Sequence, residues 1–179
     1  NPTVHNVAAT LYGRPLIMAL ATNNIFSAST VDQMPKHVSA GLMFGDGLTV
    51  PVPDLDRTEY LLILGANPLA SNGSLMTAPD VKTRLRDIVR RGGKIIVVDP
   101  RRSETAEIAT EHVFIRPGTD AYLLLAMVNV LFAENLMRLG RADGLVQGLA
   151  EVRAACAELT PEAVAERCGI AAPIIRRLA

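Results

Sequence analysis

Aromatic residues and an excess of either charge are what this sequence has least of. Tryptophan is absent and aromatic side chains make up only 4% of the 179 residues, so the core must be built from Leu, Ile, Val, Ala and Met. That composition is typical of helices packed on a parallel sheet. The 18 basic residues are balanced by 18 acidic ones, which excludes a broad electrostatic field for nucleic acid or an anionic membrane.

Cysteines and long apolar runs are also scarce. Cys156 and Cys168 have no partners at metal-ligand spacing, so we expect two buried thiols rather than a zinc or iron–sulfur site. Nothing indicates a disulfide framework. The longest apolar run, Ala121–Ala133, is well short of the ~20 residues that span a bilayer, and it predicts a buried helix without direct membrane insertion.

The two ends of the sequence suggest that it was taken from a larger polypeptide. The chain opens at Asn1-Pro2 without an initiator Met and closes at Ala179 within an expected helix. We interpret it as an excised piece, so that any targeting signal would have been left behind. At 179 residues it should form one domain that buries roughly 70% of its unfolded surface. We expect a cytoplasmic rather than a periplasmic location.

Alternation of strands and helices dominates the middle of the chain. Strands are expected at 60–64, 94–98 and 112–115, and the main helices at 81–91 and 121–135. Asp80 and Asp120 are expected to cap the two helices. The alternation implies right-handed crossovers and a parallel sheet. The predicted fold is therefore α/β, a three-layer Rossmann-like domain with a mainly parallel sheet flanked by helices.

Shorter elements are expected on either side of this region. The residues before it predict a helix that ends at Gly13, a short strand at 24–26 and a helix at 35–44. After the second core strand, residues 103–110 resemble a short helix. Beyond about residue 137 the chain is Ala-rich, and a further helix opens with Pro161 at its first position.

Glycine, amide, carboxylate and guanidinium groups follow the three strands. The segments are Gly65-Ala66-Asn67-Pro68, Asp99-Pro100-Arg101-Arg102 and Gly118-Thr119-Asp120. In an open parallel sheet, ligands lie in the crevice beyond the carboxyl ends of the strands. We therefore expect all three segments to line one crevice that suits a nucleotide.

Each residue type has a use at a nucleotide and also a structural alternative. Asp99 can accept from both ribose hydroxyls, or it can cap a helix or pair with Arg101. Arg101 and Arg102 suit a pyrophosphate, although one of them is expected to be a solvated surface charge. Asp120 could accept from the N1 and N2 groups of guanine or be a plain N-cap. Gly65 allows a sharp turn, which alone would explain the first segment.

The glycine fingerprint of a nicotinamide or flavin dinucleotide site is missing. Gly65 follows the first strand, but no G-x-G-x-x-G pattern does, and the next helix starts only after a dozen loop residues. An NAD enzyme is therefore disfavoured.

Taken together, the three segments resemble the molybdopterin oxidoreductases of the dimethyl sulfoxide reductase superfamily, which includes formate dehydrogenases and nitrate reductases. The residues that carry the resemblance are 61–68, 93–102 and 115–120, with further similarity over 1–6 and 27–36. The similarity covers most of the chain to about residue 136 and is looser over 159–178. It implies that residues 1–179 form a single cofactor-binding α/β domain, with a helical part from about 137.

The resemblance implies a bis(molybdopterin guanine dinucleotide) cofactor on molybdenum or tungsten. In such enzymes this domain holds the guanosine end of one of the two dinucleotides. The residues that it assigns to the loop at the dinucleotide are Gly65, Asn67, Ser71 and Asn72. It further assigns Asp99 and Arg101 to ribose or phosphate, and Gly118 and Asp120 to guanine. The family's [4Fe–4S] cluster would belong to an N-terminal part, because its Cys cluster is absent here.

The family usually supplies one protein ligand to the metal from the region before the first core strand. No Cys lies between Ser27 and His37. Asp32 is our first choice because a carboxylate is a hard ligand acceptable to molybdenum(VI), and Ser29 is the second. A shift of two residues in the alignment places Met34 there instead. His37 could sit near the substrate as a catalytic residue, or be structural.

The function implied is two-electron redox chemistry or oxygen-atom transfer on a small-molecule substrate. The remaining domains of the same chain, and electron-transfer subunits, are the expected partners; nucleic acid is not. The isolated domain is expected to be inactive, because it cannot enclose so large a cofactor alone. The alternatives are a metal-free structural or electron-transfer scaffold subunit of a respiratory complex, and an unrelated NAD or thiamine-diphosphate module. The retained Asp99, Arg101 and Asp120 favour the enzyme, whereas the missing Cys keeps the scaffold open.

Overall fold

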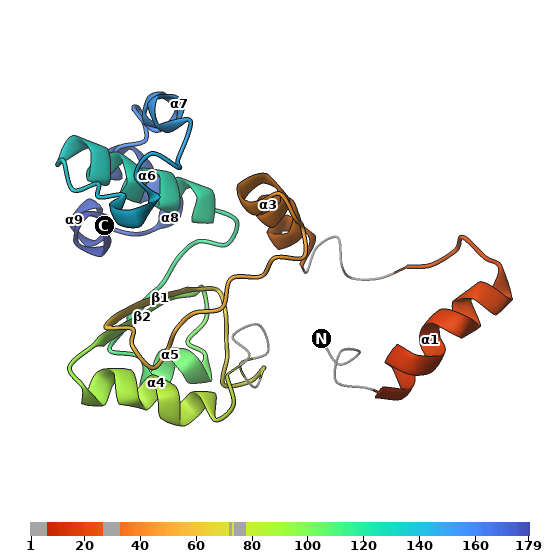
Figure 1. The fold of residues 1–179 in the computed structure, drawn as a ribbon. Helices are drawn as coiled ribbons and strands as arrows, with labels where there is room; N and C mark the ends of the chain where they lie inside the picture. Colours follow the sequence, from red (N-terminus) through yellow and green to blue (C-terminus); the bar gives the residue numbers. More distant parts are fainter. Residues whose placement is uncertain (1–6, 27–32, 72, 74–77) are drawn as a thin grey trace. The chain divides into compact units, whose positions relative to one another are not determined.

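The structure is a computed structural model that describes residues 7–26, 33–71, 73 and 78–179, and it divides into two compact units. One unit comprises residues 1–53 and 73–79, and the other comprises residues 54–72 and 80–179. The second unit contains the sheet and all the helices that follow it (Figure 1).

A three-stranded parallel sheet forms the centre of the second unit. Its strands are β1 (Tyr60–Leu64), β2 (Lys94–Val98) and β3 (Glu111–Val113), in the order β1-β2-β3. The first two match the expected ranges, which confirms the parallel α/β fold. The third lies earlier than the predicted 112–115, because the chain leaves the sheet after Val113 and the Arg116 amide donates to the Cys168 carbonyl at 2.8 Å instead.

The two crossover helices are α4 (Val81–Arg90) and α5 (Glu104–Ile108), which lie on the same side of the sheet (Figure 1). Right-handed crossovers that advance in one direction require this arrangement. Leu85 and Ile88 of α4 are fully buried, as the helical spacing of its apolar residues predicts. The predicted cap at Asp80 is wrong in detail: Asp80 holds the N-cap position in a left-handed conformation, but its side chain makes no capping bond.

The opposite face of the sheet is covered by α6 (Asp120–Ala133), α8 (Pro161–Cys168) and α9 (Ala172–Leu178). α8 begins at Pro161, as predicted. The core on this face comprises Ile96, Val98, Val113, Ile115, Leu123, Ala126, Val164, Cys168, Ile170, Ile175 and Leu178. Ile95 and Val97 are also buried, so β2 is apolar on both faces, which is the pattern of a central parallel strand.

The prediction that Asp120 caps its helix is wrong. It is the first residue of α6, Thr119 holds the N-cap position, and the Thr119 hydroxyl donates to the Arg116 carbonyl at 2.6 Å rather than serving the helix. α6 is joined to α8 through a 3-10 turn, η3 (Gly140–Ala142), and a short helix, α7 (Leu149–Ala155).

Two of the predictions for the first unit are wrong. α1 (Val7–Leu20) does not end at Gly13 but continues through Gly13 and Pro15. One interior Gly costs only about 1 kcal/mol, and in an exposed helix water can bond the carbonyl that Pro15 leaves unpaired. Residues 24–26 form no strand, because the Ile25 amide bonds locally to Asn23. α3 (Met34–Phe44) confirms the helix at 35–44.

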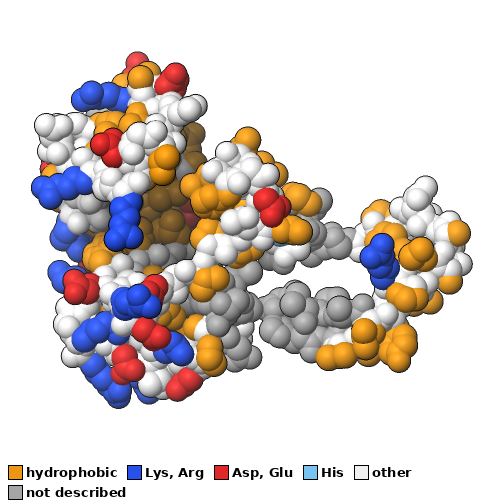
Figure 2. Space-filling view, viewed as in Figure 1, with side chains coloured by type: hydrophobic (Ala, Val, Ile, Leu, Met, Phe, Trp, Pro, Cys, Tyr) orange, Lys and Arg blue, Asp and Glu red, His pale blue; other side chains and the backbone are white. Residues whose placement is uncertain are grey.

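Exposed hydrophobic side chains gather on α1 and α3, where Figure 2 shows them in orange. Those on α1 are Val7, Leu11, Tyr12, Leu16, Ile17, Met18 and Leu20. On α3, Leu42 is 84% exposed. None of the helices described is long and apolar enough to cross a membrane.

Both cysteines are buried and unpaired, as predicted. Among the residues that the structure describes, no group of three or more His, Cys, Asp or Glu side chains could hold a metal ion.

Candidate functional site

The carboxyl edge of the sheet is open at two glycines. Gly65 follows β1 with a φ of 63° and its amide donates to the Val98 carbonyl at 2.9 Å. Gly118 precedes α6 with a φ of 77°. No described atom lies within 4 Å of the position that a Cβ would take at either residue. The backbone can therefore be approached closely by a ligand at both places.

Asp99 follows β2 and is held in a fixed orientation. It is 8% exposed, and its Oδ1 accepts from the Arg101 amide at 2.7 Å. Its backbone carbonyl accepts from Nε2 of His112 at 3.0 Å. The bond to Arg101 is thus made by the backbone, while the Arg101 guanidinium lies 3.9 Å from the Glu104 carboxylate.

Asn67 is the centre of a hydrogen-bond network between the β1 loop and α5. Its Oδ1 accepts from the Thr105 hydroxyl at 2.7 Å and from the Thr105 amide at 3.3 Å. Its Nδ2 donates to Glu104 at 2.6 Å. This bond from Asn67 holds the pKa of Glu104 below its usual range, and Arg101 acts in the same direction. Thr105 also accepts from the Leu69 amide at 3.3 Å.

The first turn of α5 was not assigned to the site from the sequence. Ser103 caps the helix by accepting from the Ala106 amide at 3.3 Å, and it is almost fully buried. Thr105 is fully buried and Glu104 is exposed. The available signal was position, since these three polar residues come directly after Asp99-Pro100-Arg101-Arg102 and must start at the same edge of the sheet.

The structure brings Asn67 and Arg101 together at Glu104, and Asp99 joins them through its bond from the Arg101 amide. Ser71 lies in the turn after Asn67, and its amide donates to the Asn67 carbonyl at 3.1 Å. Gly118 and Asp120, at the start of α6, follow the carboxyl end of β3, which is parallel to the other two strands. Of the other predicted residues, Asn72, Asp32 and Ser29 lie outside the described residues.

His37 lies in α3, in the first unit, and braces the turn after that helix. Its Nδ1 donates to the Gly47 carbonyl at 2.7 Å, which fixes the proton on Nδ1. The half-buried ring is thus held by a structural bond. A catalytic role for His37 stays a prediction.

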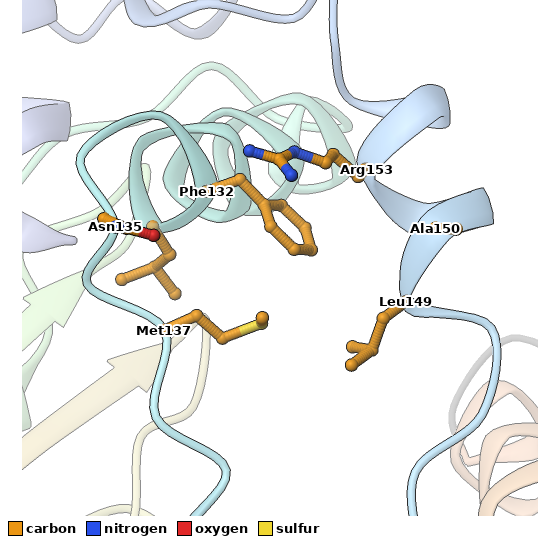
Figure 3. Close-up of a pocket in the computed structure, with 7 residues that line it drawn as sticks. Phe132, Asn135, Met137, Leu149, Ala150 and Arg153 are labelled. Atoms are coloured by element: carbon orange, nitrogen blue, oxygen red, sulfur yellow. The ribbon is translucent and has the colours of Figure 1, made fainter.

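A separate hollow of about 330 Å³ lies between α6 and α7 (Figure 3). Phe132, Met137 and Leu149 point into it, and the Arg153 guanidinium lies 5.5 Å from the centre of the Phe132 ring. Leu131, Asn135 and Ala150 complete its lining. It contains none of the strand-end residues, so it is distinct from the candidate site.

Comparison with known proteins gives consistent results. The family model "Molybdopterin oxidoreductase" matches residues 7–138. Formate dehydrogenase H of Escherichia coli is 32% identical over 161 residues, covering 89% of this chain and 22% of the relative. The molybdopterin-containing subunit of thiosulfate reductase from Salmonella typhimurium is 30% identical over 168 residues, covering 91% of this chain and 20% of the relative.

The fold is also similar to that of a solved structure. Acetylene hydratase from Pelobacter acetylenicus superposes with a TM-score of 0.72 at 28% identity, covering 93% of this chain and 22% of that one. The chain thus spans about a fifth of the length of the proteins it matches. Since the family model covers most of the sequence, including every strand-end segment, the chain belongs to the molybdopterin oxidoreductase family.

Proposed function

We propose that this chain is the domain that holds the guanosine end of one dinucleotide in a bis(molybdopterin guanine dinucleotide) enzyme of molybdenum or tungsten. The single observation that carries the proposal is the arrangement at the carboxyl edge of the sheet. Two glycines with open Cβ positions, a buried carboxylate and an exposed guanidinium all follow the carboxyl ends of the three parallel strands. The family match supports a molybdopterin cofactor but not, by itself, this form of it.

The donors and acceptors at this edge fit a guanosine dinucleotide. The Asp99 carboxylate can accept from ribose hydroxyls. Arg101, whose side chain is 73% exposed, can turn from Glu104 to a phosphate, because an exposed pair at 3.9 Å is weak. Asp120 is exposed at the start of α6, so its carboxylate can accept from the donor edge of guanine. Gly65 and Gly118 let the backbone approach the ligand.

The reaction is proposed to be two-electron redox or oxygen-atom transfer by the intact polypeptide, with chemistry supplied by the metal of the bound cofactor. We place substrate choice outside this domain, because similar sequences occur in proteins named for formate, thiosulfate and acetylene. Asp32, with Ser29 as the alternative, remains our candidate metal ligand. Because the thiosulfate reductase relative is named as a subunit, we also propose electron-transfer partner subunits.

The test is Asp120→Ala in the intact polypeptide, with guanine nucleotide released by acid and the metal both measured per chain. We expect both contents to fall several-fold while the melting temperature of the apoprotein is unchanged. Asp87→Ala is the matched control, because Asp87 lies in the last turn of α4, at the other edge of the sheet, where it pairs with Arg90 at 2.8 Å. That variant should keep full cofactor content.

Two outcomes would count against the proposal. Full guanine content in Asp120→Ala would remove the guanine role of Asp120. A wild-type polypeptide without molybdenum or tungsten would favour the metal-free scaffold instead.

A further inference from the structure

Asn67 has almost no hydrogen-bonding capacity left for a ligand. A side-chain amide oxygen accepts two bonds, and both are used by the hydroxyl and the amide of Thr105. One of its two N–H groups donates to Glu104 at 2.6 Å. The residue is therefore placed to shape the loop after β1 rather than to read a nucleotide through its carbonyl.

The Thr105 side chain is likewise used in hydrogen bonds to the loop after β1. Its hydroxyl donates to Asn67 and accepts from the Leu69 amide, so one buried oxygen ties down two points of the loop. Thr105 is 0% exposed, and water cannot replace either bond. A buried hydrogen-bonded group of this kind is costly to leave unpaired.

Glu104 extends the same network to the guanidinium. Its carboxylate accepts from Asn67 and lies 3.9 Å from Arg101, so one side chain connects the β1 loop with the segment after β2. The neighbouring Ser103 caps α5 and fixes the direction of this turn. The network thus couples the two halves of the proposed phosphate and ribose site.

We propose that Thr105 and Glu104 are positioning residues for the dinucleotide. They act through Asn67 by holding residues 67–69 in the conformation that binds, and they contribute no direct contact to the nucleotide. The proposal rests on the proposed function and assigns to α5 a role within the same site.

The experiment compares Thr105→Val and Thr105→Ser in the intact polypeptide. Valine keeps the shape but removes the hydroxyl, whereas serine keeps the hydroxyl. Apoprotein is reconstituted with increasing cofactor, and bound guanine nucleotide is measured after acid release, alongside the melting temperature of the apoprotein. We expect Thr105→Val to need about tenfold more cofactor for half-loading, the order expected for two lost loop bonds, and Thr105→Ser to behave as wild type.

Thr110→Val is the matched control. The Thr110 hydroxyl donates to the Ile95 carbonyl at 2.6 Å and accepts from the Ile95 amide at 2.9 Å, so it makes the same pair of bonds near the amino end of β2. Its loss should lower the melting temperature without changing half-loading. Equal half-loading in Thr105→Val and Thr110→Val would overturn the proposal, because the Thr105 bonds would then serve only the fold.

Glu104→Ala provides a second variant if Thr105→Val fails to fold, since Glu104 is exposed and its removal leaves the core intact. It should also raise the cofactor concentration for half-loading, and unchanged loading would overturn the coupling role of Glu104. Failure of the proposed function is recognised separately, because wild-type protein would then bind no guanine nucleotide at all.

Discussion

At the scale of single residues, a glycine can be needed for its positive φ or for the space that it leaves to a ligand, and Gly65 and Gly92 distinguish the two reasons. Gly65 and Gly92 both have positive φ, 63° and 89°, and neither has a described atom within 4 Å of a Cβ position. A side chain at either position costs roughly 1–2 kcal/mol through backbone strain alone. Only Gly65 lies at the carboxyl edge, whereas Gly92 lies before β2 at the amino edge.

The first prediction uses this pair. Gly65→Ala and Gly92→Ala in the intact polypeptide should lower the melting temperature by similar amounts, but only Gly65→Ala should reduce bound guanine nucleotide, because its methyl group fills the space next to the ligand. Nucleotide released by acid and calorimetric melting are the two measurements. A full nucleotide content in Gly65→Ala would mean that the dinucleotide does not approach this turn.

A second prediction concerns the ion pair between β3 and α9. Arg177 donates to both carboxylate oxygens of Glu111, at 2.7 and 2.5 Å, and the pairing lowers the pKa of Glu111 from its ordinary 4.5. A depressed folded-state pKa gives stability that is present above the unfolded pKa and lost as pH falls through the folded value. Glu111→Gln should therefore lower the melting temperature at pH 7 by about 2–4 °C, for a pair of about 1 kcal/mol.

The difference between Glu111→Gln and wild type should shrink as the pH falls below the ordinary pKa of Glu, about 4.3, and should vanish only below the lowered pKa of folded Glu111. Melting followed by circular dichroism from pH 3 to pH 7 measures it. Glu107→Gln on α5 is the control, because Glu107 has no ion pair among the described residues, and it should show no such trend. A constant difference at all pH values would exclude an electrostatic origin.

At the scale of elements, hydrophobic periodicity, together with the Gly, Pro and Asp residues at element ends, predicted most helices and strands of the second unit. Two runs of mainly apolar residues predicted β1 and β2 with their observed bounds, and hydrophobic periodicity predicted α4 and α6 to within two residues at each end. The errors have physical causes. The end of β3 depends on a hydrogen bond between residues distant in sequence, from the Arg116 amide to the Cys168 carbonyl. α1 continues past Gly13 because the cost of one interior glycine, about 1 kcal/mol, is too small to end a helix.

From the sequence, the candidate site could be predicted only as the segments that follow the three strands, without the hydrogen bonds that join them. Parallel-sheet topology implies that Asp99 and Asp120 share an edge with Asn67, since each follows the carboxyl end of one of the three parallel strands. The sequence could not show that Asn67 is held by Thr105, since the two residues are 38 positions apart and their bond depends on where α5 docks. The roles toward the cofactor stay predictions.

A third prediction concerns the turn from α4 into β2. A Cβ at Gly93 would lie 2.7 Å from the Glu59 carbonyl oxygen and 2.8 Å from Cγ2 of Ile88, which is closer than any real contact allows. Gly93→Ala should therefore destabilise the domain by about 1–3 kcal/mol as the turn is forced apart. Urea unfolding measures this. Gly92→Ala, with open space around its Cβ, should cost less, and the reverse order would contradict the close contacts at Gly93.

At the scale of the whole molecule, the two units differ in how well they bury apolar surface. The second has buried apolar residues on both faces of its sheet, whereas α1 leaves seven large hydrophobic side chains exposed. Exposed apolar patches of this kind mark interaction surfaces in soluble proteins. Because the matching proteins are several times longer than this chain, we expect other parts of the intact polypeptide to cover α1 and α3.

The last prediction follows from that surface. The 179-residue chain alone should bind the dye ANS and self-associate as its concentration rises, because α1 and α3 stay uncovered, whereas the intact polypeptide should do neither. Replacing Leu11 and Leu16, which are 61% and 59% exposed, with lysine should abolish the self-association without changing the melting of the second unit. Light scattering and ANS fluorescence provide the readouts. If the wild-type chain is monomeric and does not bind ANS, the apolar side chains of α1 are buried within these 179 residues. The intact polypeptide would then not be needed to bury them.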